Sequence, residues 1–310
     1  MRFVLFLLLM SLTTPSSARA QPDSSIARVL EKDLATFASW FPGRYDNELQ
    51  TFFDPDLGTP ETERRQRRHV VVRAVAAPKF GKQVFLVAGH PHAEEGDTLL
   101  ISVGADVAER SLRLEAFRVV KPLPAEAEAR DRLVAQLSDR DVAPAPDASA
   151  MIRLYANQFE GGARAEGDPP RFRLTPDEWR VAAAGPGEPY RLRKARAFEC
   201  WTAILRGARH GDSGEGLDDW RFQRGGWIHD QGGELVLTSE ETEPREIRLR
   251  LRRVEWPSGP NRPSLTLYVH EGDNRRAVSY AWAEDDAERI GINLRWVQAS
   301  CTHAPDRTFD

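Results

Sequence analysis

Short runs in which apolar and polar residues alternate recur along this chain, and they predict a protein built mainly of β-strands. The clearest cover residues 111–119 and 247–252; in the second, Ile and Leu alternate with three arginines. A period of two places one kind of side chain on each face of a sheet. The links between the runs of the first half are too short for crossover helices, so neighbouring strands are expected to be antiparallel.

Runs with this strand signature extend through both halves of the chain. They cover His69–Val75, Gln83–Ala88, Thr98–Val103, Ser111–Val120, Tyr190–Ala197, Cys200–Leu205, Trp220–Gln223, Glu234–Ser239, Glu246–Glu255, Ser264–His270 and Arg289–Gln298. About ten strands with few helices predict a single, closed or nearly closed antiparallel barrel.

Three segments depart from the strand pattern and predict helices. Apolar residues recur every three or four positions from Ile26 to Phe41, and Pro42-Gly43 ends that helix. An Ala-, Glu- and Arg-rich stretch within Pro122–Pro146 predicts a short surface helix. Thr175-Pro176-Asp177-Glu178 combines a capping box with proline at the first helical position, so a further short helix is expected there.

The first twenty residues have the pattern of a secretory signal peptide. A basic start is followed by an apolar run from Phe3 to Leu12 and by the small-x-small triplet Ala18-Arg19-Ala20. That run is too short for a membrane span, which needs about 20 apolar residues. We therefore expect cleavage before Gln21, no membrane span, and a secreted or periplasmic protein whose residues 21–310 form one domain.

Composition removes several classes of protein. A formal net charge of −4 argues against a nucleic-acid partner, and 41% hydrophobic residues argue against disorder. The two cysteines, Cys200 and Cys301, are too few for a disulfide-built miniprotein. In an oxidising compartment they are candidates for one disulfide, and a buried free Cys200 is the alternative.

Motifs that suggest catalysis or metal binding are weak in this chain. Gly211-Asp212-Ser213-Gly214 is similar to the segment around a trypsin-like nucleophile, but it has Glu215 where that family has glycine and no matching histidine segment. His90-Pro91-His92, with Glu94 and Glu95 nearby, has metal-binding residue types but the composition of a hairpin tip. We assign no metal site and no catalytic residue.

Two further patterns each leave two interpretations. Arg248, Arg250 and Arg252 share one face of their strand, which is either a solvated sheet face or, inside a barrel, a wall that binds anions. Tryptophans beside predicted strands either fill the core or line a barrel mouth that grips a flat conjugated ligand. They are Trp201, Trp220, Trp227, Trp256 and Trp296.

The segment Leu34–Gln50 resembles the opening of the CpcT/CpeT family of phycobiliprotein chromophore lyases. It has an amphipathic helix, then Gly43, the aromatic Tyr45, and Asn47 and Gln50 three residues apart. Supporting similarity extends loosely over His69–Val75, Lys79–Leu86, Phe198–Trp201 and Leu235–Glu241. The chain departs from the family at Gly89-His90, where a Glu-Gln pair is usual, and at Glu199, where glycine precedes the cysteine.

The resemblance implies a lipocalin-like barrel whose cup holds a bilin or related tetrapyrrole and delivers it to a cysteine of an acceptor protein. No cofactor is required. The candidate ligand-binding residues are Tyr45, Asn47, Gln50, Arg113 and Cys200. Tyr45, Asn47 and Gln50 have an alternative role, which is to fix the helix-to-strand turn by hydrogen bonds. Two other functions remain open: a non-catalytic periplasmic carrier of a small hydrophobic, flat or amphipathic ligand, and an envelope interaction protein.

Overall fold

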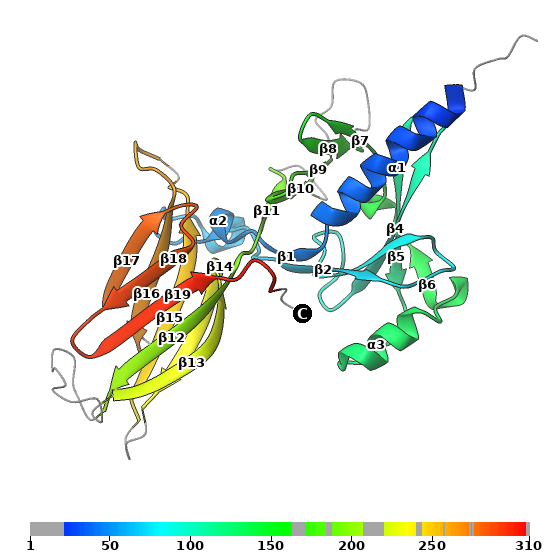
Figure 1. The fold of residues 1–310 in the computed structure, drawn as a ribbon. Helices are drawn as coiled ribbons and strands as arrows, with labels where there is room; N and C mark the ends of the chain where they lie inside the picture. The colour runs from blue at the N-terminus through cyan, green and yellow to red at the C-terminus, as the bar shows by residue number, and fades with distance from the viewer. Residues whose placement is uncertain are drawn as a thin grey trace, which may run out of the picture.

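Two assemblies of β-strands follow one another along the chain (Figure 1). The structure is a computed structural model that describes residues 22–162, 171–183, 188–206, 220–239, 244–256, 258–272, 274 and 276–307. The expected signal peptide and the Gly211–Gly214 motif lie outside these residues. Within them, no helix is both long and apolar enough to cross a membrane.

The first assembly is a closed antiparallel barrel of ten strands. The strands pair in the order β4-β3-β2-β1-β11-β10-β9-β8-β7-β5, and β5 pairs back with β4 to close the ring, while β6 (Val142–Pro144) extends β5. Closure leaves no free edge within the ring. The barrel strands are β1 (Gly43–Asp46), β2 (His69–Val75), β3 (Gln83–Ala88), β4 (Thr98–Asp106), β5 (Ser111–Val119), β7 (Ala150–Tyr155), β8 (Gln158–Gly161), β9 (Phe172–Leu174), β10 (Glu178–Val181) and β11 (Tyr190–Lys194).

The helix α1 (Pro22–Trp40) packs its apolar stripe into this barrel. Leu30 and Phe37 of the helix, and Phe41 just after it, are buried in the same core as the inward residues of the strands. Two shorter helices accompany the barrel. The helix α2 (Glu48–Thr51) follows β1, and α3 (Ala127–Val134) contributes Val134 to a second, smaller hydrophobic cluster that also contains Leu100. Short 3-10 turns occur at Glu61–Glu63, Asp139–Asp141 and Pro146–Ala148.

The second assembly is a pair of four-stranded antiparallel sheets that share one core. One sheet has the order β13-β12-β19-β18 and the other β14-β15-β16-β17, and both contribute buried side chains to a single cluster. We call this pair the sandwich. Its strands are β12 (Ala197–Leu205), β13 (Trp220–His229), β14 (Gln231–Thr238), β15 (Glu246–Val254), β16 (Ser264–Glu271), β17 (Ser279–Glu284), β18 (Arg289–Asn293) and β19 (Val297–His303).

The mainly β fold with an antiparallel barrel, an N-terminal helix and short helices is confirmed, but not every element lies where the sequence predicts it. Strands from Ala197 onward, which the sequence analysis placed in the barrel, form the sandwich instead. Most of these strands pair with their neighbours in sequence, but β12 also pairs with the distant β19, so Cys200 lies opposite Cys301. Whether residues 21–310 count as one domain stays a prediction.

Over residues 175–183, where the sequence predicts a short helix, the structure has part of a β-hairpin instead. The Thr175 hydroxyl accepts a hydrogen bond from the Glu178 backbone at 3.0 Å, as a cap would, but it closes the turn between β9 and β10. Trp179 and Val181 then alternate inward and are buried in the barrel core. Burial of these two side chains outweighs the local capping signal.

Candidate binding surface

Tyr45 is a buried residue that fastens the end of α1 to the barrel wall. Its hydroxyl lies 2.9 Å from the carbonyl oxygen of Phe41 and 3.0 Å from that of Trp40, and both share its proton. Burial raises the pKa of Tyr45 far above its usual range, so the hydroxyl remains a donor. Its ring packs edge-on against Trp179, with centroids 5.9 Å apart.

Tyr45→Phe is expected to lower the free energy of unfolding by about 1–2 kcal/mol, because it removes the donor from two helix-terminal carbonyls while keeping the ring. The measurement is urea denaturation followed by circular dichroism. Tyr155→Phe, at a half-exposed position, is the matched control and should change stability by less than about 0.5 kcal/mol. Equal effects at both positions would contradict the fastening role.

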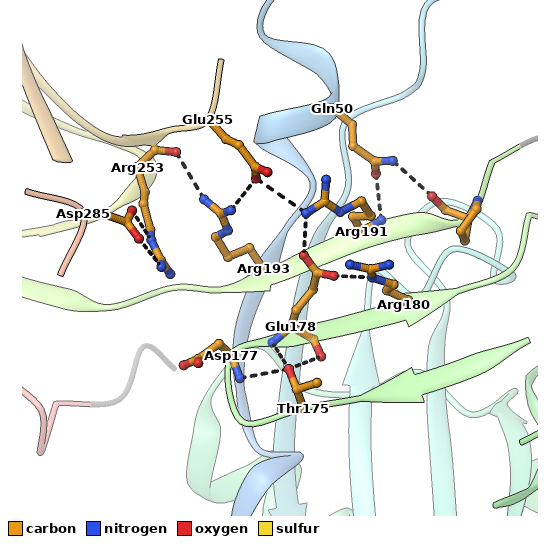
Figure 2. Close-up of polar contacts among 11 residues, drawn as sticks. Gln50, Thr175, Asp177, Glu178, Arg180, Arg191, Arg193, Arg253, Glu255 and Asp285 are labelled. Carbon is orange, nitrogen blue, oxygen red and sulfur yellow. Dashed lines mark hydrogen bonds and ion pairs between the residues drawn. The ribbon is translucent and has the colours of Figure 1, made fainter. Parts of the chain in front are cut away.

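Asn47 and Gln50 also bind backbone. The Asn47 amide accepts a hydrogen bond from the Arg68 N–H at 2.6 Å and donates to the carbonyl of Gln66 at 3.1 Å. Gln50 accepts from the Arg191 N–H at 2.7 Å and donates to a carbonyl just before β11 at 3.0 Å (Figure 2). Each amide therefore has protein partners for both its donor and its acceptor, which is the hydrogen-bonding role the sequence left open.

The other two candidate ligand residues lie away from the barrel interior. Arg113 is on the outer face of β5, paired with Asp106 (Nε–Oδ2 3.2 Å), and it lines an open groove of about 850 Å³ on the barrel wall. Cys200 is joined to Cys301 by a disulfide inside the sandwich core, so the structure contains no free cysteine among the described residues. The disulfide agrees with an oxidising compartment.

The interior of the barrel is occupied by aromatic side chains. Phe37 and Phe41 are fully buried there. Their rings contact those of Phe85, Phe159, Phe172 and Trp179 at centroid distances between 5.1 and 6.4 Å. These rings pack the barrel core around the C-terminal end of α1.

The two histidines of the His90-Pro91-His92 motif hold a turn at the end of the barrel. His92 places one ring nitrogen 2.8 Å from the carbonyl of Asp147 and the other 2.6 Å from that of Ala182. His90 is buried and its Nδ1 accepts the His92 backbone N–H at 3.1 Å. Among the residues that the structure describes, no three His, Cys, Asp or Glu side chains are grouped to hold a metal.

Acid should destabilise the fold partly through His90. Burial above all, and then the nearby His92 and Arg68, lower its pKa from 6.5 to about 3. The folded state therefore takes up this proton less readily than the unfolded chain, and the stability present above pH 6.5 is lost as pH falls toward 3. His90→Asn keeps an acceptor at the Nδ1 position and removes the titration.

The free energy of unfolding is measured by urea denaturation at pH 7 and at pH 4. Between these pH values the wild type is expected to lose roughly 3 kcal/mol more than His90→Asn, because only the wild type has this histidine to protonate on unfolding. Each free energy of unfolding is compared with that of the wild type at pH 7. A difference between the two proteins that is the same at the two pH values would contradict the account.

A buried ion pair joins α2 of the barrel to β15 of the sandwich. Glu48 accepts hydrogen bonds from Arg252 at 2.6 Å and Arg250 at 2.9 Å, and both Glu48 and Arg252 are 1% exposed. The Arg252 guanidinium also lies over the ring of Phe52. Burial lowers the pKa of Arg252, and the Glu48 carboxylate opposes that shift. The arginine face of β15 is thus partly covered by α2 and forms no barrel wall.

A second set of ion pairs links the barrel strands to the sandwich (Figure 2). Glu255, just after β15, pairs with Arg193 at 2.6 Å and with Arg191 at 3.5 Å, and Arg191 also reaches Glu178 at 3.1 Å. On the sandwich side, Arg253 and Asp285 form a bidentate pair. These contacts, together with Glu48, fix the two assemblies against each other and so determine what surrounds the end of β15.

The most distinctive open surface is an aromatic groove on β16 and β17. It has a volume of about 610 Å³ and is lined by Trp256, Asn261, Arg262, Pro263, Ser264, Thr266, Tyr268, Tyr280, Trp282, Ala283 and Glu284. Trp282 is 70% exposed and Tyr280 63% exposed. Exposed aromatic rings gathered in a groove mark recognition sites, because a folded chain otherwise buries them.

The groove is positioned by strand register. Tyr280 lies opposite Tyr268, and Trp282 lies opposite Thr266, which in turn faces Arg252 on β15. Ala281 and Ala283 alternate with these aromatics and pack against the sandwich core. Trp256 is supported from the barrel side by Phe53, whose ring centroid is 5.5 Å away.

The sequence analysis missed three of the four aromatic residues of this groove. It named Trp256 but predicted no strand at β17. The signal was present in Tyr280-Ala281-Trp282-Ala283, which alternates large aromatics with alanine. Alanine is a weak indicator of a buried face, so this alternation alone does not predict a strand whose aromatic side faces solvent.

Comparison with known proteins gives no relative. No family model, no curated protein and no solved structure matches this chain. The barrel that the CpcT/CpeT resemblance implies is present, and membership of that family gains no support from these comparisons.

Proposed function

We propose that this protein is a non-catalytic carrier that binds a flat or amphipathic ligand in the aromatic groove of the sandwich. The observation that carries the proposal is the exposure of Tyr280 and Trp282 on one face of β17, in a groove of about 610 Å³. That volume lies within the range of small-molecule sites. Aromatic residues supply contact area at a low entropic cost on ordering, since few bonds rotate.

The barrel contributes a scaffold in this proposal. Its interior is filled by Phe37 and Phe41, and its ion pairs hold α2 and Phe53 behind Trp256. Attachment of a bilin to an acceptor cysteine, which the family resemblance implies, would require an open cup and a proton donor beside the ligand. The groove is an open binding face on the sandwich and not a cup inside the barrel, and this favours the carrier over the lyase.

The test is titration of the purified full chain with biliverdin, a flat conjugated probe, followed by its visible absorption band. Saturable binding is expected, and Trp282→Ala should weaken it at least tenfold. Trp201→Ala, an exposed tryptophan on the other sheet, is the matched control and should bind like the wild type.

A second arm adds an acceptor protein with a free cysteine and looks for a thioether adduct by mass spectrometry. No faster adduct formation is expected. Accelerated thioether formation would show that the protein is a lyase. Biliverdin binding that is unchanged by Trp282→Ala would show that the ligand binds outside the groove.

A further inference from the structure

The groove has a chemical character that is more specific than flat or amphipathic. Tyr268 and Tyr280 lie side by side, with ring centroids 6.2 Å apart and planes inclined by 40°. They belong to adjacent strands on one sheet face and line the groove together.

Polar side chains are interleaved with the aromatic ones. Thr266 lies opposite Trp282, and Ser264 lies opposite Glu284, with the two hydroxyl oxygens 3.2 Å apart. Asn261 and Arg262 are exposed along the rim. The lining therefore combines hydroxyl, amide, guanidinium and carboxylate groups with the aromatic rings.

This combination matches one chemical class. A pyranose ring has a face of C–H groups and a rim of hydroxyls, and the negative face of an aromatic ring attracts weakly positive C–H groups. Sugar hydroxyls need both donors and acceptors around them, which the amide, guanidinium, carboxylate and hydroxyl groups provide. Tyr280 and Trp282 are two residues apart, about 7 Å along the strand. Adjacent rings at this spacing form a row, which suits a chain of sugar units.

Charge decides between neutral and ionic glycans. The groove is lined by one cation, Arg262, and one anion, Glu284. A balanced lining provides no net attraction for an acidic chain. We infer that the aromatic groove of β16 and β17 binds a neutral glycan chain, with pyranose faces on Trp282 and Tyr280 and hydroxyls hydrogen-bonded to the polar rim. This inference rests on the proposed function, because it names the ligand of the same site.

The experiment is isothermal titration calorimetry of the full chain against cellohexaose, xylohexaose and a hexamer of N-acetylglucosamine, with biliverdin as a parallel arm. At least one neutral oligosaccharide is expected to bind. Trp282→Ala should weaken that binding at least tenfold, and Glu284→Gln should weaken it several-fold. Trp201→Ala should stay within twofold of the wild type, and circular dichroism of each variant checks that it folds.

The outcomes separate the inference from the proposal beneath it. If biliverdin binding depends on Trp282 while no oligosaccharide binds, the glycan inference is overturned and the carrier proposal stands. If no probe depends on Trp282, both are overturned. A Trp282-dependent dimer in sedimentation velocity, without sugar binding, would make the face a protein interface and would also overturn the inference.

Discussion

Removing the Cys200–Cys301 disulfide is expected to lower the free energy of unfolding by about 4–5 kcal/mol, the largest single effect that we predict for this chain. The bond connects positions 101 residues apart in sequence. It therefore removes much of the conformational freedom of the unfolded chain. Both cysteines are buried in the sandwich core, on directly opposed positions of β12 and β19.

The measurement is urea denaturation of the wild type and of the Cys200→Ala/Cys301→Ala double variant, each with and without dithiothreitol. Reductant should destabilise the wild type by a similar amount and leave the double variant unchanged. Without dithiothreitol, a difference below about 1 kcal/mol in the free energy of unfolding between the wild type and the double variant would mean that the disulfide contributes little to the stability of the sandwich.

Glu48→Ala is expected to lower the free energy of unfolding by about 3–5 kcal/mol. The substitution leaves the guanidinium of Arg252, which is 1% exposed, without its carboxylate, and it removes the nearer of the two carboxylate partners of Arg250. A buried charge without a partner costs far more than the net contribution of the intact pair. Glu48→Gln keeps an acceptor oxygen and is expected to lose less.

The matched control is Glu246→Ala, which removes an exposed glutamate paired with Arg248 at 3.2 Å on the same strand. Solvent screens that pair, so the expected loss is below about 1 kcal/mol. Urea denaturation measures both variants. Equal losses at the two positions would show that the contact between α2 and β15 is no stronger than a surface ion pair.

Glu48→Ala also tests how the groove is held. Arg252 lies opposite Thr266, and Thr266 lies opposite Trp282, so the ion-paired arginine, the threonine and the exposed indole occupy neighbouring positions across three strands. Phe53, just after α2, packs against Trp256. Loss of the ion pair is therefore expected to weaken ligand binding as well as folding.

Of the ten barrel strands, β2, β3, β4, β5 and β11 could be predicted because their signal is local, whereas the short strands β1, β7, β8, β9 and β10 were not predicted. The ranges 69–75 and 83–88 coincide with β2 and β3, and the alternation at 111–119 coincides with β5. Partner choice is not local. Nothing in the pattern of β12 distinguishes pairing with β11, which precedes it directly, from pairing with β19, so its place in a sandwich could not be inferred.

The candidate site was less predictable for the same reason. Arg252 was visible as one of three alternating arginines, but its partner Glu48 lies 204 residues away in sequence. Trp282 and Tyr280 became visible as surface residues only when the structure showed which face of β17 the alanines cover. Tyr45 was identified from a motif, and its hydrogen bonds to the end of α1 required coordinates.

The most direct test of the groove is NMR of the indole N–H groups in ¹⁵N-labelled protein, with each resonance assigned by a single Trp→Phe variant. Cellohexaose and biliverdin are the two probes. We expect saturable shifts of the Trp256 and Trp282 resonances, with the Trp201 and Trp227 resonances unchanged. Shifts confined to tryptophans outside the groove, or no shifts with either probe, would contradict this expectation.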